Sequence, residues 1–346
     1  MTEHAQVVVI GGGVTGCSIA WHLAKAGVGD VVLLERSELT AGSTWHAAGG
    51  TSAYGGGANS TFLHKYSFEL YPALEAETGQ SCGFHHVGAM RLARTRSRVE
   101  ELARERSLLK RHGLTGEWLN LNEAREKAPV LNTSSVKAAL FEDAGGYVDP
   151  SGVTHAFAKG ARDHGVTITR QCPVLETNPR PGGGWDVVTA RGTIRADKIV
   201  NAAGLWAREV AALAGITLPL MPVEHHYLVT ETLPEVEALD FELPLIGDAD
   251  AEFYSRQEGQ GMLIGFYEAP CTHWSAETTP LDFGHELLPD DLGRVESVLA
   301  QAVESLPVLG RAGIKRVINR PMIFSPDLGP LIGPYPGHPT TGVPAG

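Results

Sequence analysis

The sequence contains no uninterrupted apolar run that approaches the roughly 18 residues of a membrane-spanning helix. Its most apolar stretch, residues 202–220, is interrupted by Arg208 and Glu209. A signal peptide is not expected either, because the first predicted strand begins near Gln6 and leaves no room for one. These absences favour a cytoplasmic protein.

Cysteine and positive charge are also scarce. The four cysteines lie far apart and form no C-x-x-C pair, which argues against a zinc site or a disulfide framework and is typical of a reducing compartment. The 28 basic residues are outnumbered by 40 acidic ones, which gives a net charge of −12. Such a chain repels phosphate backbones and anionic lipids, so neither nucleic acid nor a membrane surface is an expected partner.

Patterns of metal ligands are missing as well. The two histidine pairs, His85-His86 and His225-His226, lie in stretches that read as strands, where adjacent side chains point to opposite faces. Neither pair can easily chelate an ion, so no metal site is predicted.

Glycine, by contrast, is abundant: it occupies 41 of the 346 positions, against an ordinary share of about 7%. Two clusters, residues 11–16 and 42–57, lie near the N-terminus. A chain of this length has room for roughly two domains.

The first 35 residues predict a strand, a helix and a second strand. Val7–Ile10 is a continuous apolar run typical of a buried parallel strand. Cys17–Lys25 has the pattern of a helix, and Gly27 stands at the position of a C-cap. Val31–Leu34 is the second buried strand, and Glu35 follows it directly.

The turn between this strand and helix carries the spacing Gly11-x-Gly13-x-x-Gly16. Gly11 permits a tight turn, Gly13 lets the backbone approach a pyrophosphate, and Gly16 allows the helix to pack closely on the strand. The helix N-terminus favours a phosphate, and Glu35 can accept hydrogen bonds from a ribose hydroxyl. The unit predicts dinucleotide binding and does not choose between NAD and FAD.

Nucleotide-type elements then alternate with antiparallel ones. Residues 147–213 contain a helix, a β-meander around Pro181–Gly184 and a buried strand, Lys198–Asn201. Residues 218–266 change to a period of two, which is typical of an antiparallel sheet, and an amphipathic helix is expected over residues 289–306. The predicted fold class is α/β: a Rossmann-like domain interleaved with a second domain of antiparallel sheet and helices.

The segment after the second strand, Thr40 to Gly49, consists mainly of small residues. Its backbone amides are placed to run along the rest of a long dinucleotide. His46 has only small neighbours in the chain apart from Trp45. From the residues alone, a helix-cap or core histidine and a functional one both fit.

The segments Val8–Gly16 and Val32–Gly49 closely resemble the dimethylglycine and sarcosine dehydrogenases, members of the D-amino-acid-oxidase-like flavoprotein group. The Gly-Ser-Thr-Trp-His-Ala-Ala-Gly block is specific to this branch. The resemblance covers nearly the whole chain and continues through residues 77–80, 201–210, 222–227, 325–327 and 333–334.

The resemblance implies FAD as the cofactor, joined covalently through the flavin 8α-methyl carbon to His46. It also implies that residues 1–60 and 146–215 form the FAD-binding domain. Residues 61–145 and 216–320 are then the substrate domain, and residues 321–346 an incomplete return to the FAD domain. Beyond Gly11, Gly13, Gly16 and His46, the expected flavin contacts are Val14, Thr15, Glu35, Arg36, Gly42, Ser43, Thr44, Trp45, Ala47, Ala48, Gly49, Gly50, Val174 and Trp206.

On the substrate side, Val223, His225, Tyr227 and Val229 alternate onto one face of a strand. The resemblance places His225 near the flavin as a base or as a hydrogen-bond partner that keeps the substrate amine neutral. Tyr254 resembles a tyrosine that the family places near the substrate. A satisfied strand histidine and a packing tyrosine are the structural alternatives.

Two segments depart from the family. Tyr54–Asn59 is richer in glycine than the usual loop. In relatives, the residues after Gly333-Pro334 form a final strand, a glycine-rich loop over the flavin ring and a helix, before a folate-binding domain. Tyr335 to Gly346 is expected to lack a terminal element, which suggests a fragment or a truncated product.

The resulting hypothesis is FAD-dependent oxidative N-demethylation of a secondary or tertiary amino acid of the dimethylglycine or sarcosine type. Hydride passes to the flavin, and the iminium yields formaldehyde or a folate-bound one-carbon unit. Oxygen and an electron-transfer flavoprotein are both possible electron acceptors. The alternatives are a truncated flavin-binding remnant without turnover and, less favoured, an NAD-dependent dehydrogenase.

Overall fold

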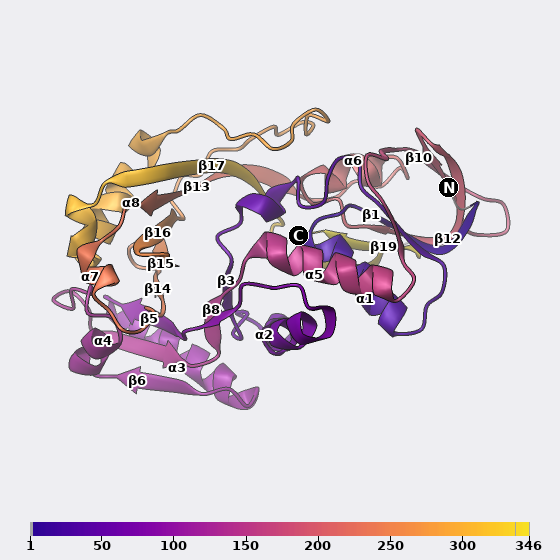
Figure 1. The fold of residues 1–346 in the computed structure, drawn as a ribbon. Coiled ribbons are helices and arrows are strands. Elements are labelled where there is room, and N and C mark those ends of the chain that lie inside the picture. Colours follow the sequence, from indigo (N-terminus) through magenta and orange to yellow (C-terminus); the bar gives the residue numbers. More distant parts are fainter. Residues whose placement is uncertain (1–2, 336, 346) are drawn as a thin grey trace.

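The computed structural model describes residues 3–335 and 337–345. Two eight-stranded sheets dominate it, and helices pack on their faces (Figure 1). The first sheet, which contains β1 and β12, lies on the side of the molecule where the N-terminus is marked. The second, which contains β13 and β16, lies on the opposite side. The predicted α/β class, with a nucleotide-type sheet interleaved in sequence with a mainly antiparallel one, is confirmed.

The first sheet contains the predicted strand–helix–strand unit. Its strands are β1 (His4–Ile10), β2 (Val31–Leu34), β9 (Thr167–Thr169), β10 (Val174–Pro179), β11 (Trp185–Thr189), β12 (Gly192–Asn201), β18 (Leu331–Tyr335) and β19 (His338–Ala345). The order is β10-β11-β12-β1-β2-β9, with β1 parallel to both β2 and β12. The antiparallel hairpin β10–β11 matches the predicted meander. All four residues of β2 are buried, as its apolar run predicts.

Two helices cover one face of this sheet. They are α1 (Val14–Lys25) and α5 (Pro150–Asp163), which pack against each other. Trp21 of α1 and Phe157 of α5 are buried between them, with ring centroids 5.6 Å apart. Because α1 begins directly after the glycine-rich turn, this packing fixes the turn beside the ends of β1 and β2.

The prediction for the C-terminal residues was wrong. Instead of ending without an element, the chain forms β18, turns at Gly337 with φ +81°, and returns as β19. β11 pairs with β12 only over Gly192–Ala196, so the second half of β12 offers unpaired backbone groups on that edge. β19 pairs there in parallel, with Thr341 opposite Ile199.

The second sheet is antiparallel except at one pair. Its strands are β5 (Ala89–Ala93), β6 (Gly116–Leu119), β7 (Ala138–Glu142), β13 (Met221–Thr230), β14 (Leu245–Asp248), β15 (Phe253–Glu258), β16 (Gly261–Phe266) and β17 (Ile314–Phe324). The order is β17-β13-β16-β15-β14-β5-β7-β6, and only β14 and β5 run parallel. The antiparallel sheet expected over residues 218–266 is thereby confirmed.

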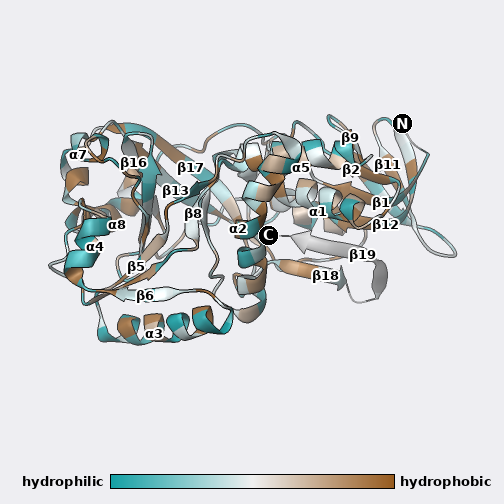
Figure 2. Ribbon diagram, turned by 60° about the horizontal axis from the view of Figure 1, so that its bottom comes forward, coloured by the Kyte–Doolittle hydropathy of each residue, from teal (hydrophilic) through white to brown (hydrophobic). Residues whose placement is uncertain are grey.

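Helices pack on the second sheet and cover its apolar core. They are α3 (Arg96–Arg111), α4 (Leu121–Lys127), α7 (Pro234–Glu237) and α8 (Leu292–Ser305), of which α8 matches the helix predicted over residues 289–306. Val295 and Val298 of α8 are buried in one cluster with Met90 and Phe266. In Figure 2, hydrophobic and hydrophilic residues alternate along α3, which buries Leu102 and Leu109.

Smaller elements join the two sheets. A three-stranded sheet is made of β3 (Gly50–Ser52), β4 (His85–His86) and β8 (Gly145–Tyr147), in the order β3-β8-β4. The remaining elements are α2 (Ala58–Thr78), α6 (Ala207–Ala212) and the 3₁₀ turns η1 (Ser43–His46), η2 (Gly204–Trp206) and η3 (Pro307–Arg311). We propose that each large sheet is the centre of one of the two domains expected from the sequence. Among the described residues, no helix is long and apolar enough to cross a membrane.

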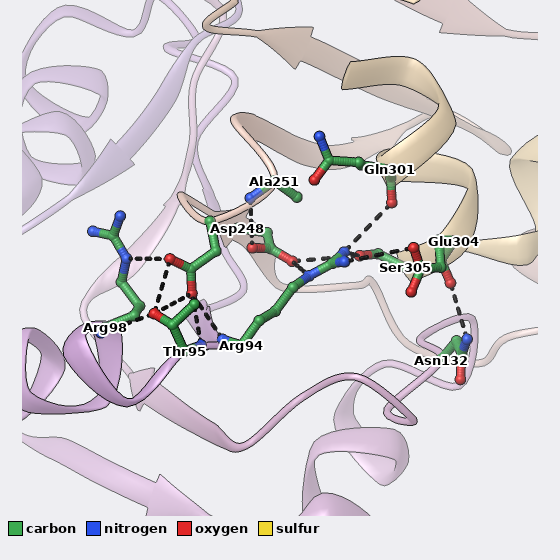
Figure 3. Close-up of polar contacts among 10 residues, drawn as sticks. Arg94, Thr95, Arg98, Asn132, Asp248, Ala251, Gln301, Glu304 and Ser305 are labelled. Carbon is green, nitrogen blue, oxygen red and sulfur yellow. Dashed lines mark hydrogen bonds and ion pairs between the residues drawn. The ribbon is translucent and has the colours of Figure 1, made fainter. Parts of the chain in front are cut away.

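A buried ion-pair network ties the second sheet to its helices (Figure 3). Asp248, the last residue of β14, is fully buried, and its Oδ2 accepts from Arg94 Nε at 2.7 Å. Arg94 also donates to Ser305 at the end of α8. Nearby, Asp250 accepts from the backbone of Arg94 and from Arg98 of α3. The network therefore fixes β14 and β5 against α3 and α8.

We predict that Asp248→Asn lowers the free energy of unfolding by about 3–5 kcal/mol, because it removes the buried carboxylate of Arg94 and leaves only Glu304, which is half exposed and 3.8 Å away. Chemical denaturation monitored by circular dichroism measures the loss. Asp163→Asn is the matched control, since Asp163 forms an exposed pair with Lys159 and its loss should cost less than about 0.5 kcal/mol. Equal effects of the two substitutions would contradict the prediction.

Candidate functional site

The glycine-rich turn after β1 leaves no space for side chains. A Cβ at Gly11 would lie 2.3 Å from the carbonyl oxygen of Ala202, and one at Gly16 would lie 1.9 Å from that of Gly11. Gly11 also has φ +117°, which a residue with a side chain rarely adopts. The first turn of α1 contains no acidic residue, and Gly13 gives it no side-chain cap. Apart from the Val14 N–H, which donates to Thr44, the amide end of α1 is therefore available to an anion.

Glu35, at the end of β2, lies beside this turn. It is 9% exposed, and its carboxylate accepts from the backbone N–H of Gly12 and of Ser37, each at 2.7 Å. Burial raises the pKa of Glu35 above its usual value. Thr15 lies in the first turn of α1. The predicted contacts Gly11, Gly13, Thr15, Gly16 and Glu35 thus come together at the ends of β1 and β2.

Three further expected flavin contacts, Arg36, Gly42 and Trp206, lie close to one another. The Arg36 guanidinium lies 3.8 Å from the centre of the Trp206 ring. A Cβ at Gly42 would lie 3.2 Å from the Trp206 ring. Val174, at the start of β10, packs on the core cluster of Ile10 and Leu34, and the neighbouring Cys172 N–H donates to the Glu35 carbonyl.

The segment from Thr40 to Gly50 runs from this turn to the second sheet. Thr44 Oγ1 accepts from the Val14 N–H at 3.2 Å, which joins η1 to α1. Ser43 Oγ donates to the Pro321 carbonyl of β17 at 3.4 Å, and the carbonyl of Ala48 accepts from Arg256 of β15 at 2.7 Å. The segment is thus attached at one end to the nucleotide-type fold and at the other to the antiparallel sheet.

A cavity of about 460 Å³ opens where the segment meets the sheet. It brings together three residues that the sequence singled out separately, His46, His225 and Tyr254, with residues 47–50 along one wall. Arg91, Tyr227, Tyr267 and Arg320 also line it.

His46 is 6% exposed, and its Nε2 has no hydrogen-bond partner among the described residues. Burial, followed by the nearby charge of Arg320, lowers the pKa of His46 to about 3. The imidazole is therefore neutral at physiological pH and keeps a free lone pair on one ring nitrogen, which is the state required of a nucleophile.

His225 and Tyr254 form a pair in the same cavity. Tyr254 Oη lies 3.3 Å from His225 Nε2, and Tyr267 stands beside both rings. The tyrosine can reach across the sheet because its neighbour on β16 is Gly265, where a Cβ would lie 2.0 Å from the tyrosine ring. Burial lowers the pKa of His225 to about 4 and raises the pKa of Tyr254 far above its usual value. Both groups are uncharged at neutral pH.

The sequence analysis missed Arg320 of β17. This arginine is 1% exposed, and its Nε and Nη2 have no hydrogen-bond partner among the described residues. Its guanidinium lies 3.5 Å from the centre of the Trp45 ring. Burial lowers the pKa of Arg320 to about 10, so it stays charged at neutral pH. A signal was present, since Arg320 is the one charged residue between Val317 and Phe324.

Strand register explains why Arg320 faces the cavity. On the antiparallel pair β13–β17, Arg320 stands directly opposite His225, and side chains in such positions point to the same face. The next histidine, His226, points the other way, where its Nδ1 lies 2.5 Å from Arg294 Nη2 and its Nε2 accepts from the Asp291 N–H. The alternation predicted for β13 is consistent with these contacts.

The pattern of the family described as FAD dependent oxidoreductase matches residues 6–343. The chain belongs to this family of FAD-dependent oxidoreductases. Mitochondrial dimethylglycine dehydrogenase from Rattus norvegicus is 45% identical over 340 residues, which cover 97% of this chain and 40% of the rat protein. Mitochondrial sarcosine dehydrogenase from Homo sapiens is 33% identical, covering 96% of this chain and 36% of the human protein.

The chain thus spans less than half the length of these relatives. A solved structure, L-proline dehydrogenase from P. horikoshii, matches with a TM-score of 0.87 at 25% identity and covers 100% of this chain and 88% of the other. The residues present fit the FAD that gives the family its name. The crowded glycine turn at Gly11 to Gly16 suits a pyrophosphate, and the unpartnered His46 Nε2 belongs to η1, which is hydrogen-bonded to the first turn of α1 through Thr44 and Val14.

No group of three or more histidine, cysteine, aspartate or glutamate side chains able to hold a metal occurs in the described part of the chain. His85 instead pairs with Glu242 at 2.9 Å. His86 pairs with Asp143 at 3.5 Å and packs edge-on against Phe68.

Proposed function

We propose that this chain carries the FAD and substrate sites of an enzyme that oxidatively demethylates a small N-methylated amino acid. The observation that carries the proposal is the single cavity in which His46, the His225–Tyr254 pair and the unpaired cation of Arg320 meet. The names of the similar dehydrogenases support dimethylglycine or sarcosine as substrate.

In this proposal the glycine-rich turn, with Val14 and Thr15, holds the pyrophosphate of FAD, and Glu35 accepts from a ribose hydroxyl. Arg36, Trp206, Val174 and the Gly42–Gly50 segment hold the remainder, and His46 is bonded covalently to the ring. When bound, the flavin supplies the two-electron acceptor that takes hydride from the substrate N-methyl carbon.

The protein's own contribution is to hold the substrate with its amine neutral. The Arg320 guanidinium pairs with the substrate carboxylate, which cancels both charges. An ammonium group would then leave one uncompensated positive charge in a buried cavity, which is costly. The neutral imidazole of His225 takes the ammonium proton and passes it on to solvent, so that the positive charge leaves the cavity, and the Tyr254 hydroxyl beside it holds the ring in place. Only the neutral amine has the lone pair that assists loss of hydride.

Loss of hydride leaves an iminium ion on the substrate nitrogen. Addition of water and cleavage of the carbon–nitrogen bond give formaldehyde and the demethylated amine; transfer of the one-carbon unit to a folate is the alternative. The proposed electron acceptor is oxygen or an electron-transfer flavoprotein, and the proposed location is the cytoplasm.

The experiment that tests this function is the anaerobic addition of dimethylglycine or sarcosine to the flavin-loaded protein. We expect the flavin absorption band to bleach, because two electrons pass from the N-methyl group to the ring. In His225→Gln, which removes a proton acceptor, bleaching should slow by about 100-fold or more. The wild-type rate should keep the contribution of His225 above about pH 5 and lose it as the pH falls through its pKa of about 4.

His85→Gln is the control, because His85 pairs with Glu242 and does not line the cavity. It should bleach at the wild-type rate. An unchanged spectrum with flavin bound would instead identify a flavin-binding protein without turnover. Release of NAD rather than flavin on denaturation would reject the cofactor assignment.

A further inference from the structure

Arg320 carries a buried charge that no carboxylate contacts among the described residues, and Glu286 acts on this charge only from a distance. No carboxylate forms an ion pair with it there, although it is 1% exposed. A buried cation normally has such a partner, because the loss of hydration is otherwise uncompensated. Its guanidinium lies over the indole of Trp45, 3.5 Å from the ring centre. The charge is therefore available to act on whatever enters the cavity.

Trp45 connects this charge to His46. The Arg320 guanidinium lies over the indole of Trp45. The planes of the indole and the His46 ring are nearly perpendicular, and their centroids are 5.7 Å apart. His285 packs on the indole as well, at 5.4 Å. Arg320 and His46 line the same cavity. After burial, the charge of Arg320 is the largest cause of the low pKa of His46.

We propose that Arg320 promotes the covalent attachment of the flavin to His46, and that Trp45 is the positioning residue that holds the guanidinium in the cavity. The inference rests on the proposed function, in which His46 carries the flavin. Arg320 would then have two roles: it promotes attachment of the flavin before the first turnover, and it pairs with the substrate carboxylate during turnover.

The attachment reaction has two requirements that Arg320 meets. A bond forms between His46 Nε2 and the 8α-methyl carbon while one carbon–hydrogen bond of that methyl group breaks. The methyl group and the imidazole each release one proton, and two electrons enter the ring; dioxygen removes these electrons with the two protons as hydrogen peroxide. The imidazole must be unprotonated to react, and the ring must accept negative charge. A fixed cation in a buried cavity favours both.

The test follows attachment directly. Protein expressed under riboflavin limitation is incubated with FAD in air, and samples are run on a denaturing gel whose flavin fluorescence is measured after an acid soak. In Arg320→Met we expect the fluorescent band to appear about 100-fold more slowly or slower still. Removal of one group that stabilises charge at a reaction centre typically has an effect of this size. Arg320→Lys should recover most of the rate, because it restores the charge.

The control is Arg316→Met. Arg316 lies four residues earlier on β17 and is exposed. The substitution therefore removes the same charge from the same strand at a residue that does not line the cavity. It should attach flavin at the wild-type rate. Retention of yellow, non-covalently bound flavin by Arg320→Met shows that the variant is folded. As the pH is lowered, attachment in Arg320→Met should stop at a higher pH than in the wild type. The reason is that loss of the Arg320 charge raises the pKa of His46, and a protonated His46 cannot react.

Attachment at the wild-type rate in Arg320→Met, or failure of Arg320→Lys to recover it, would overturn the inference. A wild-type protein that bleaches with substrate but shows no fluorescent band would overturn covalent attachment and this inference, and leave amine oxidation standing. A fluorescent wild-type band that depends on Arg320, in a protein that no amine bleaches, would support the inference and reject the proposed function.

Discussion

His46→Ala should give no fluorescent flavin band on an acid-soaked denaturing gel, whereas the wild-type protein should give a clear one. The reason is chemical: the lone pair on the unpartnered Nε2 is the nucleophile that bonds the flavin, and alanine has none. The expected effect is complete loss rather than a reduced rate, because alanine leaves position 46 without a nucleophile. Among the described residues that line the cavity, His225 is the only other histidine.

His225→Gln is therefore the matched control for this experiment. It removes the second cavity histidine and should keep the fluorescent band at wild-type intensity. Flavin released from His46→Ala on denaturation would show that the cofactor site survives without the bond. If the band persists in His46→Ala, the bond lies on another residue; if the wild type is dark but releases flavin, attachment is non-covalent.

The parts of the molecule that the sequence predicts well are those determined by neighbouring residues. The turn from Gly11 to Gly16 lies between a strand and a helix, and Glu35 follows the next strand, so local pattern alone assigns their positions. The same is true of β13, whose alternation predicts that His225 and His226 face opposite sides. These features need only the periods of strands and helices.

The parts that the sequence does not predict depend on pairing between distant strands. Arg320 faces the cavity because β17 pairs with β13 in a register that sets it opposite His225, 95 residues earlier in the chain. Tyr254 reaches His225 only because Gly265 lies beside it on β16. The error at the C-terminus has the same origin, since β19 is held by the unpaired half of β12. Register is a tertiary property that no local pattern contains.

Arg320 should also make the enzyme reject amines that lack a carboxylate. We predict that kcat/KM for dimethylglycine exceeds that for N,N-dimethylethylamine by about 10⁴- to 10⁵-fold, the discrimination found when a site built for a polar group meets an analogue without it. The physical reason is that the analogue leaves the charge of Arg320 buried and unpaired. Stopped-flow measurement of flavin bleaching with each amine gives the ratio.

In Arg320→Met the same ratio should collapse to within about tenfold, since the cavity then has no cation to leave unpaired and no reason to prefer the carboxylate. Because the ratio compares two amines on one protein, it is insensitive to any change in the flavin itself. Arg316→Met should keep the wild-type ratio. A wild-type preference of less than about 100-fold would place the carboxylate elsewhere, and Arg91, the other arginine among the described residues that line the cavity, would be the residue to test. Arg91 is the weaker candidate because Glu105 and Glu142 already pair with it at 2.7 and 2.9 Å, so its charge is compensated before any substrate arrives.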